Sequence, residues 1–343
     1  MQTHPTPEPG RRRRPGGLRA AVVAVALAAL AVTGAGTSPA VAATYPGPGA
    51  VTGSVSPVHD PTMVKRPDGT YVVISTGQNL DVRTSTDRTR FTHVGKVFPN
   101  GASWTLPYTD PSDPTALWAP DLSYRNGQYY LYYSASSFGS NRSAIFLATS
   151  PTAMPGTWTH RGRIIETTTS STYNAIDPSL TVDASGAWWL SFGSFWSGIK
   201  MIRLNSETGL RSTTQTTVHS LASRPTAGGS VEAPTIFRRG GYYYLFVSFD
   251  LCCRGADSTY RTMVGRSTSI TGPYRDRAGT LMTAGGGTEI LASHGSVYGP
   301  GHPGVFTDAD ADVLTYHYYT STGTPRLGLN LLGWDSSAWP YVY

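Results

Sequence analysis

Cysteine is almost absent from this 343-residue sequence, and its only two cysteines, Cys252 and Cys253, are adjacent. Adjacent cysteines cannot build the framework of long-range disulfides that holds small secreted domains together. Two states remain open for the pair: two small buried thiols, or a strained bond between neighbours whose Cα atoms lie closer than ordinary disulfide geometry allows. Without a disulfide framework, stability must come from a core, which the roughly 300 residues after the N-terminal segment are enough to form.

An excess of charge of one sign is also lacking once the start of the chain is set aside. The whole sequence has 27 basic and 21 acidic residues, but residues 1–42 hold five arginines and one glutamate. The remaining 22 basic and 20 acidic residues nearly balance. The sequence therefore offers no electrostatic case for binding nucleic acid.

Residues 1–42 have the pattern of a secretory signal. Arginines stand at 11–14 and 19, an apolar run covers 20–32, and Ala-Val-Ala at 40–42 offers a cleavage site. The apolar run is too short for a membrane-spanning helix, so we expect this segment to be removed on export. Residues 43–343 would then act outside the cell as a monomeric domain with no membrane anchor.

A convincing amphipathic helix is missing after the signal. Short runs rich in Val, Ile, Thr and aromatic residues alternate with clusters of Gly, Pro, Asn and Asp about every ten residues. This alternation predicts an all-β fold.

One sequence unit recurs five times. Each unit has a polar residue beside proline, then a turn, then an aromatic strand, as in Ala119-Pro120-Asp121, Asn126-Gly127 and the run at 129–133. A period near 60 residues accommodates four strands and predicts a five-bladed β-propeller, whereas a β-sandwich would not explain the repeat. The polar heads are 61, 56, 55 and 70 residues apart, and they are Asp60, Asp121, Asp177, Glu232 and His302.

Radial symmetry would bring these heads together at the axis. Cleavage of a glycosidic bond needs one carboxylic acid to protonate the leaving oxygen and one carboxylate to activate water or attack carbon. Glu232 is the candidate acid, because apolar neighbours and the charge of Asp177 would keep it protonated, and Asp60 is the candidate base. Asp121 departs from the pattern because proline precedes it, which favours a structural or peripheral role.

The loops after the aromatic strands should lie beside the heads, because a hairpin places the start of one strand next to the end of the other. These loops are small and polar with isolated aromatic residues, such as Phe195 and Trp196. Such a surface suits a sugar, whose ring packs on an aromatic face while its hydroxyls form hydrogen bonds.

Together these residues resemble the arabinanase-like members of glycoside hydrolase family 43, over roughly residues 55–343. The resemblance rests on Val-His-Asp-Pro at 58–61, Trp-Ala-Pro-Asp at 118–121, Asn-Ala-Ile-Asp-Pro-Ser at 174–179, Gly-Ser-Phe-Trp-Ser-Gly at 193–198, Val-Glu-Ala-Pro at 231–234, Cys-Cys-Arg-Gly at 252–255 and Gly-Pro-Gly-His at 299–302.

The resemblance implies a five-bladed propeller that cleaves internal α-1,5-L-arabinofuranosidic bonds of arabinan with inversion. It makes Asp60 the general base, Glu232 the general acid and Asp177 the group that orients the acid and raises its pKa. It implies substrate contacts at Asp60, Gly139, Asn174, Ala175, Ile176, Asp177, Ser194, Phe195 and Trp196. It also implies a calcium or sodium ion on the axis, held largely by water with His302 as protein ligand, and no organic cofactor. Imidazole is an unusual ligand for so hard a cation.

Other functions stay open at this point. An exo-acting arabinofuranosidase or a xylosidase of the same family would close one end of the groove with longer loops. A propeller lectin would repeat one site in each blade, whereas the five heads differ. A retaining fructan hydrolase would carry Arg-Asp-Pro where this chain has Ile176-Asp177-Pro178.

Overall fold

The computed structural model describes residues 44–343, so the predicted signal at 1–42 lies outside the described residues. In the described part, nearly all regular structure is β-strand. Its three helices are single 3-10 turns at Ser103–Thr105, Gly255–Asp257 and Met282–Ala284. No helix within 44–343 is long and apolar enough to cross a membrane.

Twenty of the described strands form five blades of four antiparallel strands in chain order, which confirms the predicted propeller. The first blade contains β2 (His59–Lys65), β3 (Tyr71–Gln78), β4 (Asp81–Ser85) and β5 (Arg90–Lys96). The second contains β6 (Ala116–Arg125), β7 (Gln128–Ala135), β8 (Ser143–Ser150) and β9 (Thr159–Thr167). The third contains β10 (Ser179–Val182), β11 (Trp188–Phe192), β12 (Ile199–Arg203) and β13 (His219–Ala222).

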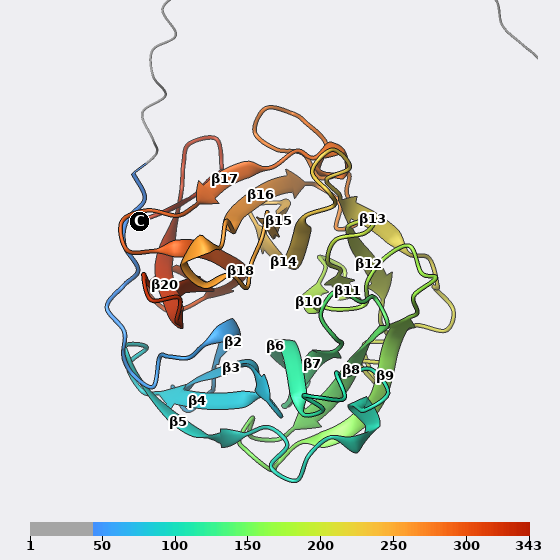
Figure 1. Cartoon of the computed structure of the whole chain (residues 1–343). Helices are drawn as coiled ribbons and strands as arrows, with labels where there is room; N and C mark the ends of the chain where they lie inside the picture. The colour runs from blue at the N-terminus through green and yellow to red at the C-terminus, as the bar shows by residue number, and fades with distance from the viewer. Residues whose placement is uncertain (1–43) are drawn as a thin grey trace, which may run out of the picture. The chain divides into compact units, whose positions relative to one another are not determined.

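The last two blades follow the same plan. The fourth contains β14 (Val231–Arg239), β15 (Tyr242–Phe249), β16 (Arg261–Ser267) and β17 (Thr288–Leu291). The fifth contains β18 (Tyr298–Thr307), β19 (Asp312–Tyr319), β20 (Pro325–Trp334) and β21 (Pro340–Val342). Figure 1 shows the blades arranged in a ring, with β2, β6, β10, β14 and β18 nearest the centre. A short pairing of β3 with β6, at Gly77 with Leu117, joins the first two blades into one sheet.

The backbone repeats more strictly than the polar heads do. In every blade the residue before the head proline has a left-handed φ: Asp60 (45°), Ala119 (47°), Asp177 (57°), Ala233 (54°) and His302 (56°). Four of the inner hairpins shift register at this point, as expected for a β-bulge. A non-glycine residue in this conformation costs of order 1–3 kcal/mol, so its recurrence marks the axial position of each blade.

This repeat corrects the alignment of the five heads made from the sequence. Ala119, not Asp121, is the counterpart of Asp60 in the second blade, and Ala233, not Glu232, is the counterpart in the fourth. The error arose because polarity was aligned, whereas the equivalent feature is the backbone turn before proline. Glu232 therefore enters the site from one residue before the axial position.

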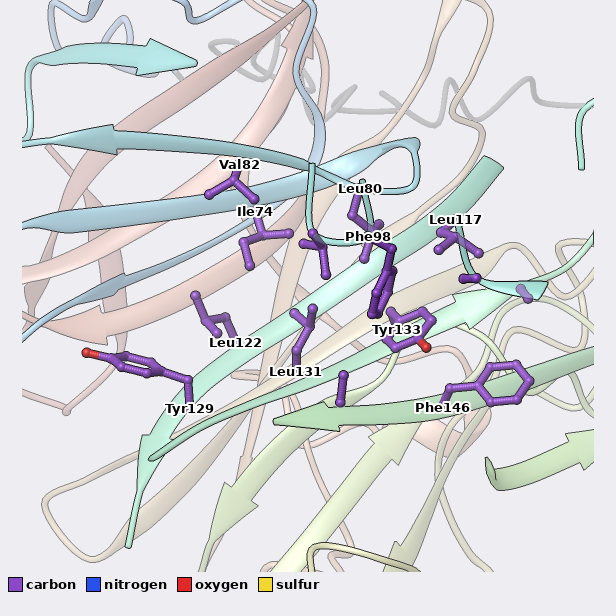
Figure 2. Packing of buried hydrophobic residues seen from close by; sticks show 14 of the residues in the cluster. Ile74, Leu80, Val82, Phe98, Leu117, Leu122, Tyr129, Leu131, Tyr133 and Phe146 are labelled. Atoms are coloured by element: carbon purple, nitrogen blue, oxygen red, sulfur yellow. The ribbon is translucent and has the colours of Figure 1, made fainter. Parts of the chain in front are cut away.

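The hydrophobic core lies between blades rather than at the axis. Five clusters of buried residues each combine side chains from two adjacent blades, and together they go round the ring. Figure 2 shows the cluster between the first two blades, where Ile74 and Val82 pack near Leu122 and Leu131. Full burial of such a side chain contributes about 1.5–3 kcal/mol, so the blade interfaces supply the stability that long-range disulfides do not.

The segment before the first blade closes the ring. Gly49 donates its N–H to the carbonyl of Leu329 in β20 (2.7 Å), and Leu327 donates to Val55 (3.0 Å). The same segment contains β1 (Thr52–Gly53), which pairs in parallel with β5. Residues 49–55 thus bind the fifth blade to the first.

Candidate active site

A cavity of about 790 Å³ lies beside the starts of the inner strands and is lined by residues from all five blades. This volume is in the range of small-molecule sites. The structure brings together in its wall nearly all of the residues predicted from the sequence, namely Asp60, Gly139, Asn174, Ile176, Asp177, Ser194, Phe195, Trp196, Glu232 and His302.

Ala175 is the exception among the predicted contacts. Its side chain is fully buried in the hydrophobic cluster between the second and third blades, and Ala175 is not among the residues that line the cavity. Its neighbour Asn174 lines the cavity and is itself buried, and Oδ1 of Asn174 has no hydrogen-bond partner among the described residues. That oxygen is itself shielded from solvent, so Asn174 faces the cavity with other atoms.

Asp60 is held by a set of hydrogen bonds that covers most of its lone pairs. The hydroxyl of Thr76 donates to Oδ2 (2.7 Å), and Nδ1 of His59 lies 2.9 Å from the same oxygen. Two further imidazoles approach Oδ1, namely His302 at 3.2 Å and His317 at 3.4 Å. The carboxyl group is thus fixed in orientation at the wall of the cavity.

The two histidines near Oδ1 differ in what they can donate. Nδ1 of His317 accepts the backbone N–H of Asp60 (3.1 Å), so this nitrogen carries no proton and cannot donate to Oδ1. Burial, and then the nearby His59, lowers the pKa of His317 well below its usual range, which keeps the ring neutral. Nδ1 of His302 is therefore the donor to Oδ1, and one lone pair of this oxygen stays free to take a proton.

Glu232 sits across from this cluster on β14 and is held by two hydroxyl groups. Ser194 donates to Oε2 and Tyr260 donates to Oε1. The Tyr260 ring reaches this place because residue 301 is glycine, and a Cβ there would collide with the ring. The carboxyl group of Glu232 is buried but faces the cavity.

Asp177 contacts the backbone beside Glu232 rather than its carboxyl group. Its Oδ2 accepts the N–H of Ala233 (3.0 Å), and its own N–H donates to the hydroxyl of Ser134 (3.0 Å). Asp177 therefore fixes the turn that aims Glu232 into the cavity.

The three carboxyl groups differ in their affinity for a proton. Burial alone would raise the pKa of Asp60, but the neighbouring His59 and His302 outweigh it and hold the pKa well below the usual range. Burial and then the charge of Asp177 raise the pKa of Glu232 to about 8. Burial, partly offset by His302, raises the pKa of Asp177 to about 6. One wall of the cavity thus holds an ionised carboxylate and another a protonated acid, which is the pairing that general acid–base chemistry needs.

Asp121 is not part of this group. Its Oδ2 accepts the N–H of Leu180 (2.9 Å), which connects the second blade to β10 of the third. Burial raises the pKa of Asp121 to about 6, but this carboxyl group is not among the residues that line the cavity. The structural role favoured by the sequence agrees with this position.

Several residues of the site were not singled out from the sequence. His59 and Thr76 bind Asp60, while Tyr260 binds Glu232 and His317 accepts from the backbone of Asp60. Thr76 could have been found, because it follows the aromatic strand of the first unit, where head-facing loops were expected. His317 and Tyr260 lie in or beside strands far along the chain and carry no local signal.

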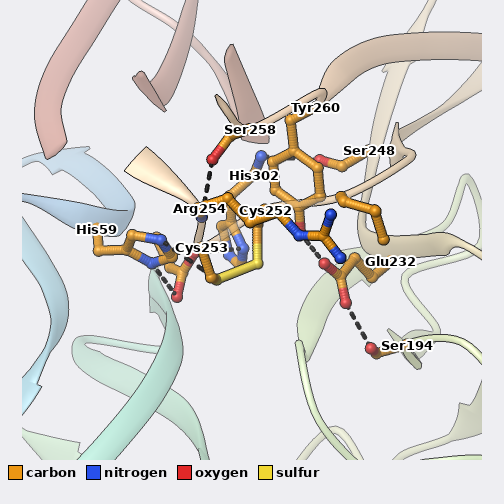
Figure 3. The surroundings of a disulfide bond; sticks show 12 residues. His59, Ser194, Glu232, Ser248, Cys252, Cys253, Arg254, Ser258, Tyr260 and His302 are labelled. Carbon is orange, nitrogen blue, oxygen red and sulfur yellow. Dashed lines mark hydrogen bonds and ion pairs between the residues drawn. A yellow bond between two sulfur atoms is a disulfide. The ribbon is translucent and has the colours of Figure 1, made fainter. Parts of the chain in front are cut away.

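The two cysteines form a disulfide with each other, which decides between the alternatives left open by the sequence. They are not a buried pair: Cys252 is half-buried, Cys253 is exposed, and both line the cavity. In the view of Figure 3 the disulfide lies between His59 and Glu232.

Comparison with known proteins places this site in a family. The model of the family described as glycosyl hydrolases family 43 matches residues 55–340. The extracellular endo-α-(1→5)-L-arabinanase 1 of Bacillus subtilis (strain 168) is 44% identical over 288 residues, covering 82% of this chain and 87% of that protein.

Solved structures show the same similarity. A family 43 endo-arabinanase from Bacillus licheniformis matches with a TM-score of 0.79 and 45% identity, over 85% of this chain and 99% of that one. An exo-1,5-α-L-arabinanase from a bovine ruminal metagenomic library matches with a TM-score of 0.79 and 37% identity, over 85% and 99%.

Proposed function

The chain belongs to glycosyl hydrolases family 43, and from this premise we propose that it is an inverting endo-arabinanase that hydrolyses internal α-1,5-L-arabinofuranosidic bonds of arabinan. The observation that carries the proposal is the pair of carboxyl groups with opposite protonation, Asp60 and Glu232, on the wall of one sugar-sized cavity. The names of the relatives supply the substrate, because both the curated relative and the solved structures act on arabinan.

The geometry gives each carboxyl group a role. Asp60 accepts a proton from water through the free lone pair of Oδ1, while the water oxygen attacks the anomeric carbon. Glu232 gives its proton to the leaving glycosidic oxygen, so the two protons balance and the anomeric configuration inverts. Asp177 positions the acid through the N–H of Ala233 and, when ionised, helps to keep Glu232 protonated.

The proposed substrate contacts line the same cavity as this pair. Trp196 is 42% exposed and Phe195 lines the same wall, so they offer apolar faces to arabinose rings. Asn174 lines the same cavity and is a further proposed contact. The other proposed contacts also line the cavity, namely Asp60, Gly139, Ile176, Asp177 and Ser194, whereas the side chain of Ala175 belongs to the core.

Product analysis tests the proposal and separates it from its alternatives. The enzyme is incubated with linear debranched arabinan, and products are sized at early times. An endo enzyme releases a range of oligosaccharides, whereas a single short product would indicate exo action, as in the ruminal relative's name. Binding without turnover would indicate a lectin, and retention of configuration by NMR would contradict inversion.

A cation at the axis is the second part of the proposal. Burial lowers the proton affinity of His302, but the charges of Asp60, Asp177 and Glu232 outweigh it and raise its pKa to about 9. The axis thus has a negative potential that a cation would neutralise. Nδ1 of His302 faces Asp60, and its other ring nitrogen has no hydrogen-bond partner among residues 44–343. With a pKa of about 9 the ring of His302 is protonated near neutral pH, so it would hold a calcium or sodium ion, surrounded largely by water, only after Nε2 gives up its proton while Nδ1–H keeps its bond to Asp60.

A neighbouring group of possible ligands fits less well. His59, Asp60 and His317 have ligand atoms within 4.8 Å of one another. However, both nitrogens of His59 and Nδ1 of His317 already take part in hydrogen bonds. An ion bound at His302 would supply positive charge beside the proposed catalytic carboxyl groups.

The place of action follows from the same relatives. The curated relative is named as extracellular, and residues 1–42 of this chain have the pattern of an export signal. We therefore propose that the enzyme is secreted and acts as a monomer on polymer outside the cell. Secretion is tested by the presence of the mature protein, beginning near residue 43, in the culture medium.

A further inference from the structure

The loop between β15 and β16 carries the adjacent disulfide, which the catalytic roles above do not use. Both cysteines line the cavity, and the base of the loop is pinned by Asp250, which pairs with Arg224 (2.5 Å) and Arg261 (2.7 Å). Thr259 closes the loop by donating its N–H to the carbonyl of Leu251 (2.8 Å). The disulfide is thus held in place at the rim of the site.

A chain of hydrogen bonds leads from this disulfide to the general base. The N–H of Cys253 donates to the hydroxyl oxygen of Tyr319 (3.1 Å), which lies 2.6 Å from Nε2 of His59. Nδ1 of His59 in turn lies 2.9 Å from Oδ2 of Asp60. The ring of His59 is stacked on that of His317, with centroids 3.8 Å apart, so it has little freedom to turn.

The directions of the bonds in this chain follow from its two ends. A backbone N–H can only donate, so the Tyr319 oxygen accepts from Cys253. The ionised Asp60 can only accept, so Nδ1 of His59 carries a proton, and Nε2 of the neutral ring then accepts the proton of Tyr319. One tautomer of His59 satisfies the whole chain, and it is the tautomer that gives Asp60 a hydrogen bond.

The disulfide fixes the hydrogen bond from Cys253 to Tyr319, because its ring includes the peptide group that donates this bond. The bond between adjacent cysteines closes a small ring that contains the peptide between them, and the N–H of Cys253 belongs to that peptide. Cys253 has a left-handed φ of 66°, a conformation that non-glycine residues adopt rarely without support. Opening the ring would release both the conformation and the direction of this N–H.

We propose that the Cys252–Cys253 disulfide, with Tyr319 and His59, is a positioning element for the general base Asp60, so that the reduced enzyme turns over more slowly. The proposal rests on the proposed function in that it takes Asp60 as the base. None of these groups needs to touch the substrate for the effect.

Kinetics on linear arabinan test the proposal with the full secreted enzyme. The oxidised wild type is compared with the reduced wild type and with the C252A/C253A and Tyr319→Phe variants. A phosphine reduces the disulfide: it takes the oxygen of one water and leaves two thiols and a phosphine oxide. We expect kcat to fall roughly ten- to one-hundredfold in each case, because a displacement of about 1 Å costs up to that much. KM should change less than about twofold, since the lost interaction serves the transition state.

Two controls separate positioning from general damage. Tyr316 lies in the same strand as Tyr319, but its hydroxyl donates to Asn330 (2.6 Å) and takes no part in the hydrogen-bond chain to Asp60. Tyr316→Phe should therefore leave kcat unchanged. Combining Tyr319→Phe with C252A/C253A should cause no further loss, because both break the same chain. The phosphine should have no effect on C252A/C253A, and all assays are run below the melting temperature of each variant.

The state of the His59 ring can be measured without turnover, so the positioning role of the disulfide can be tested separately from arabinan hydrolysis. In nitrogen NMR of the imidazoles, Nε2 of His59 should show the chemical shift of an unprotonated nitrogen that accepts a hydrogen bond in the oxidised wild type and in Tyr316→Phe, and should lose the shift caused by this hydrogen bond in the reduced and Tyr319→Phe enzymes. An unchanged Nε2 chemical shift or an unchanged kcat would overturn the positioning role. A raised KM with normal kcat would also overturn it and would indicate that the disulfide contacts substrate. Failure of the oxidised wild type to cleave arabinan would instead refute the proposed function, whatever the NMR result.

Discussion

At the scale of single residues, the site separates two carboxyl groups by their surroundings. Asp60 receives hydrogen bonds from Thr76, His59 and His302, which stabilise its charge. Glu232 is buried with only two hydroxyl groups and faces the charge of Asp177, which favours its protonated form. The assignment of base and acid thus follows from what each carboxyl group contacts.

Removal of either group should abolish activity without unfolding the protein. Asp60→Ala and Glu232→Gln should each lower kcat at least about a hundredfold, the scale of general acid–base catalysis. The raised pKa of Glu232 means that the unfolded state loses this proton first, so wild-type stability falls as pH rises from about 4.5 to about 8. Glu232→Gln should therefore melt at a higher temperature than wild type at pH 8, in thermal unfolding monitored by circular dichroism. A lower melting temperature would contradict the buried, protonated state.

Asp177 should act on the pH profile through its charge. Asp177→Asn removes a negative charge beside Glu232, so the pKa of the acid should fall and the alkaline limb of kcat against pH should move to lower pH. The acidic limb, set by Asp60, should move less. An alkaline limb that stays in place would limit Asp177 to its contact with the N–H of Ala233.

At the scale of elements, the join between the first and fifth blades carries a cluster of charges. Asp308, in the turn between β18 and β19, pairs with Lys65 (2.8 Å) and Arg88 (2.6 Å) and accepts from the hydroxyl of Tyr71. Burial opposes its charge, but these partners outweigh burial and hold the pKa of Asp308 well below its usual range. The turn thus connects two blades whose strands are more than two hundred residues apart.

Loss of this carboxylate should weaken ring closure and leave the chemistry intact. Asp308→Ala should lower the free energy of unfolding by about 2 kcal/mol, less than for a fully buried pair because Lys65 is partly exposed. Asp310→Ala is the matched control, since Asp310 pairs with the same Arg88 but is exposed. Urea unfolding measures both, and equal losses would show that the buried position of Asp308 has no special weight. Activity of both variants should remain at the wild-type level below their melting temperatures.

At the scale of the whole molecule, four of the five blades direct three carboxyl groups and a histidine into one cavity, which concentrates negative charge. If a cation neutralises it, exhaustive chelation should lower the melting temperature and kcat together, and calcium should restore both. His302→Ala should imitate the chelated enzyme and should not respond to calcium. A metal-free preparation with unchanged melting temperature and rate would make His302 a hydrogen-bond partner of Asp60 only.

Much of this molecule could be predicted from local sequence. The repeated proline segment, turn and aromatic strand specified five blades, because each unit is a hairpin whose strands and turn are close in the chain. Asp60 and Glu232, the base and acid that we propose, could be singled out as well, since they accompany that repeat. The state of Cys252 and Cys253 could not be decided, because adjacency permits both a thiol pair and a bond.

The tertiary structure decided which groups surround those carboxyl groups. His317 and Tyr319 reach the first blade only because ring closure places β19 beside β2, about 260 residues apart in the chain. Likewise, the left-handed turn at Ala119 showed that Asp121 is displaced from the axis. Hydrogen-bond partners and pKa shifts depend on such distant neighbours, and no local pattern specifies which blade will stand next to the first.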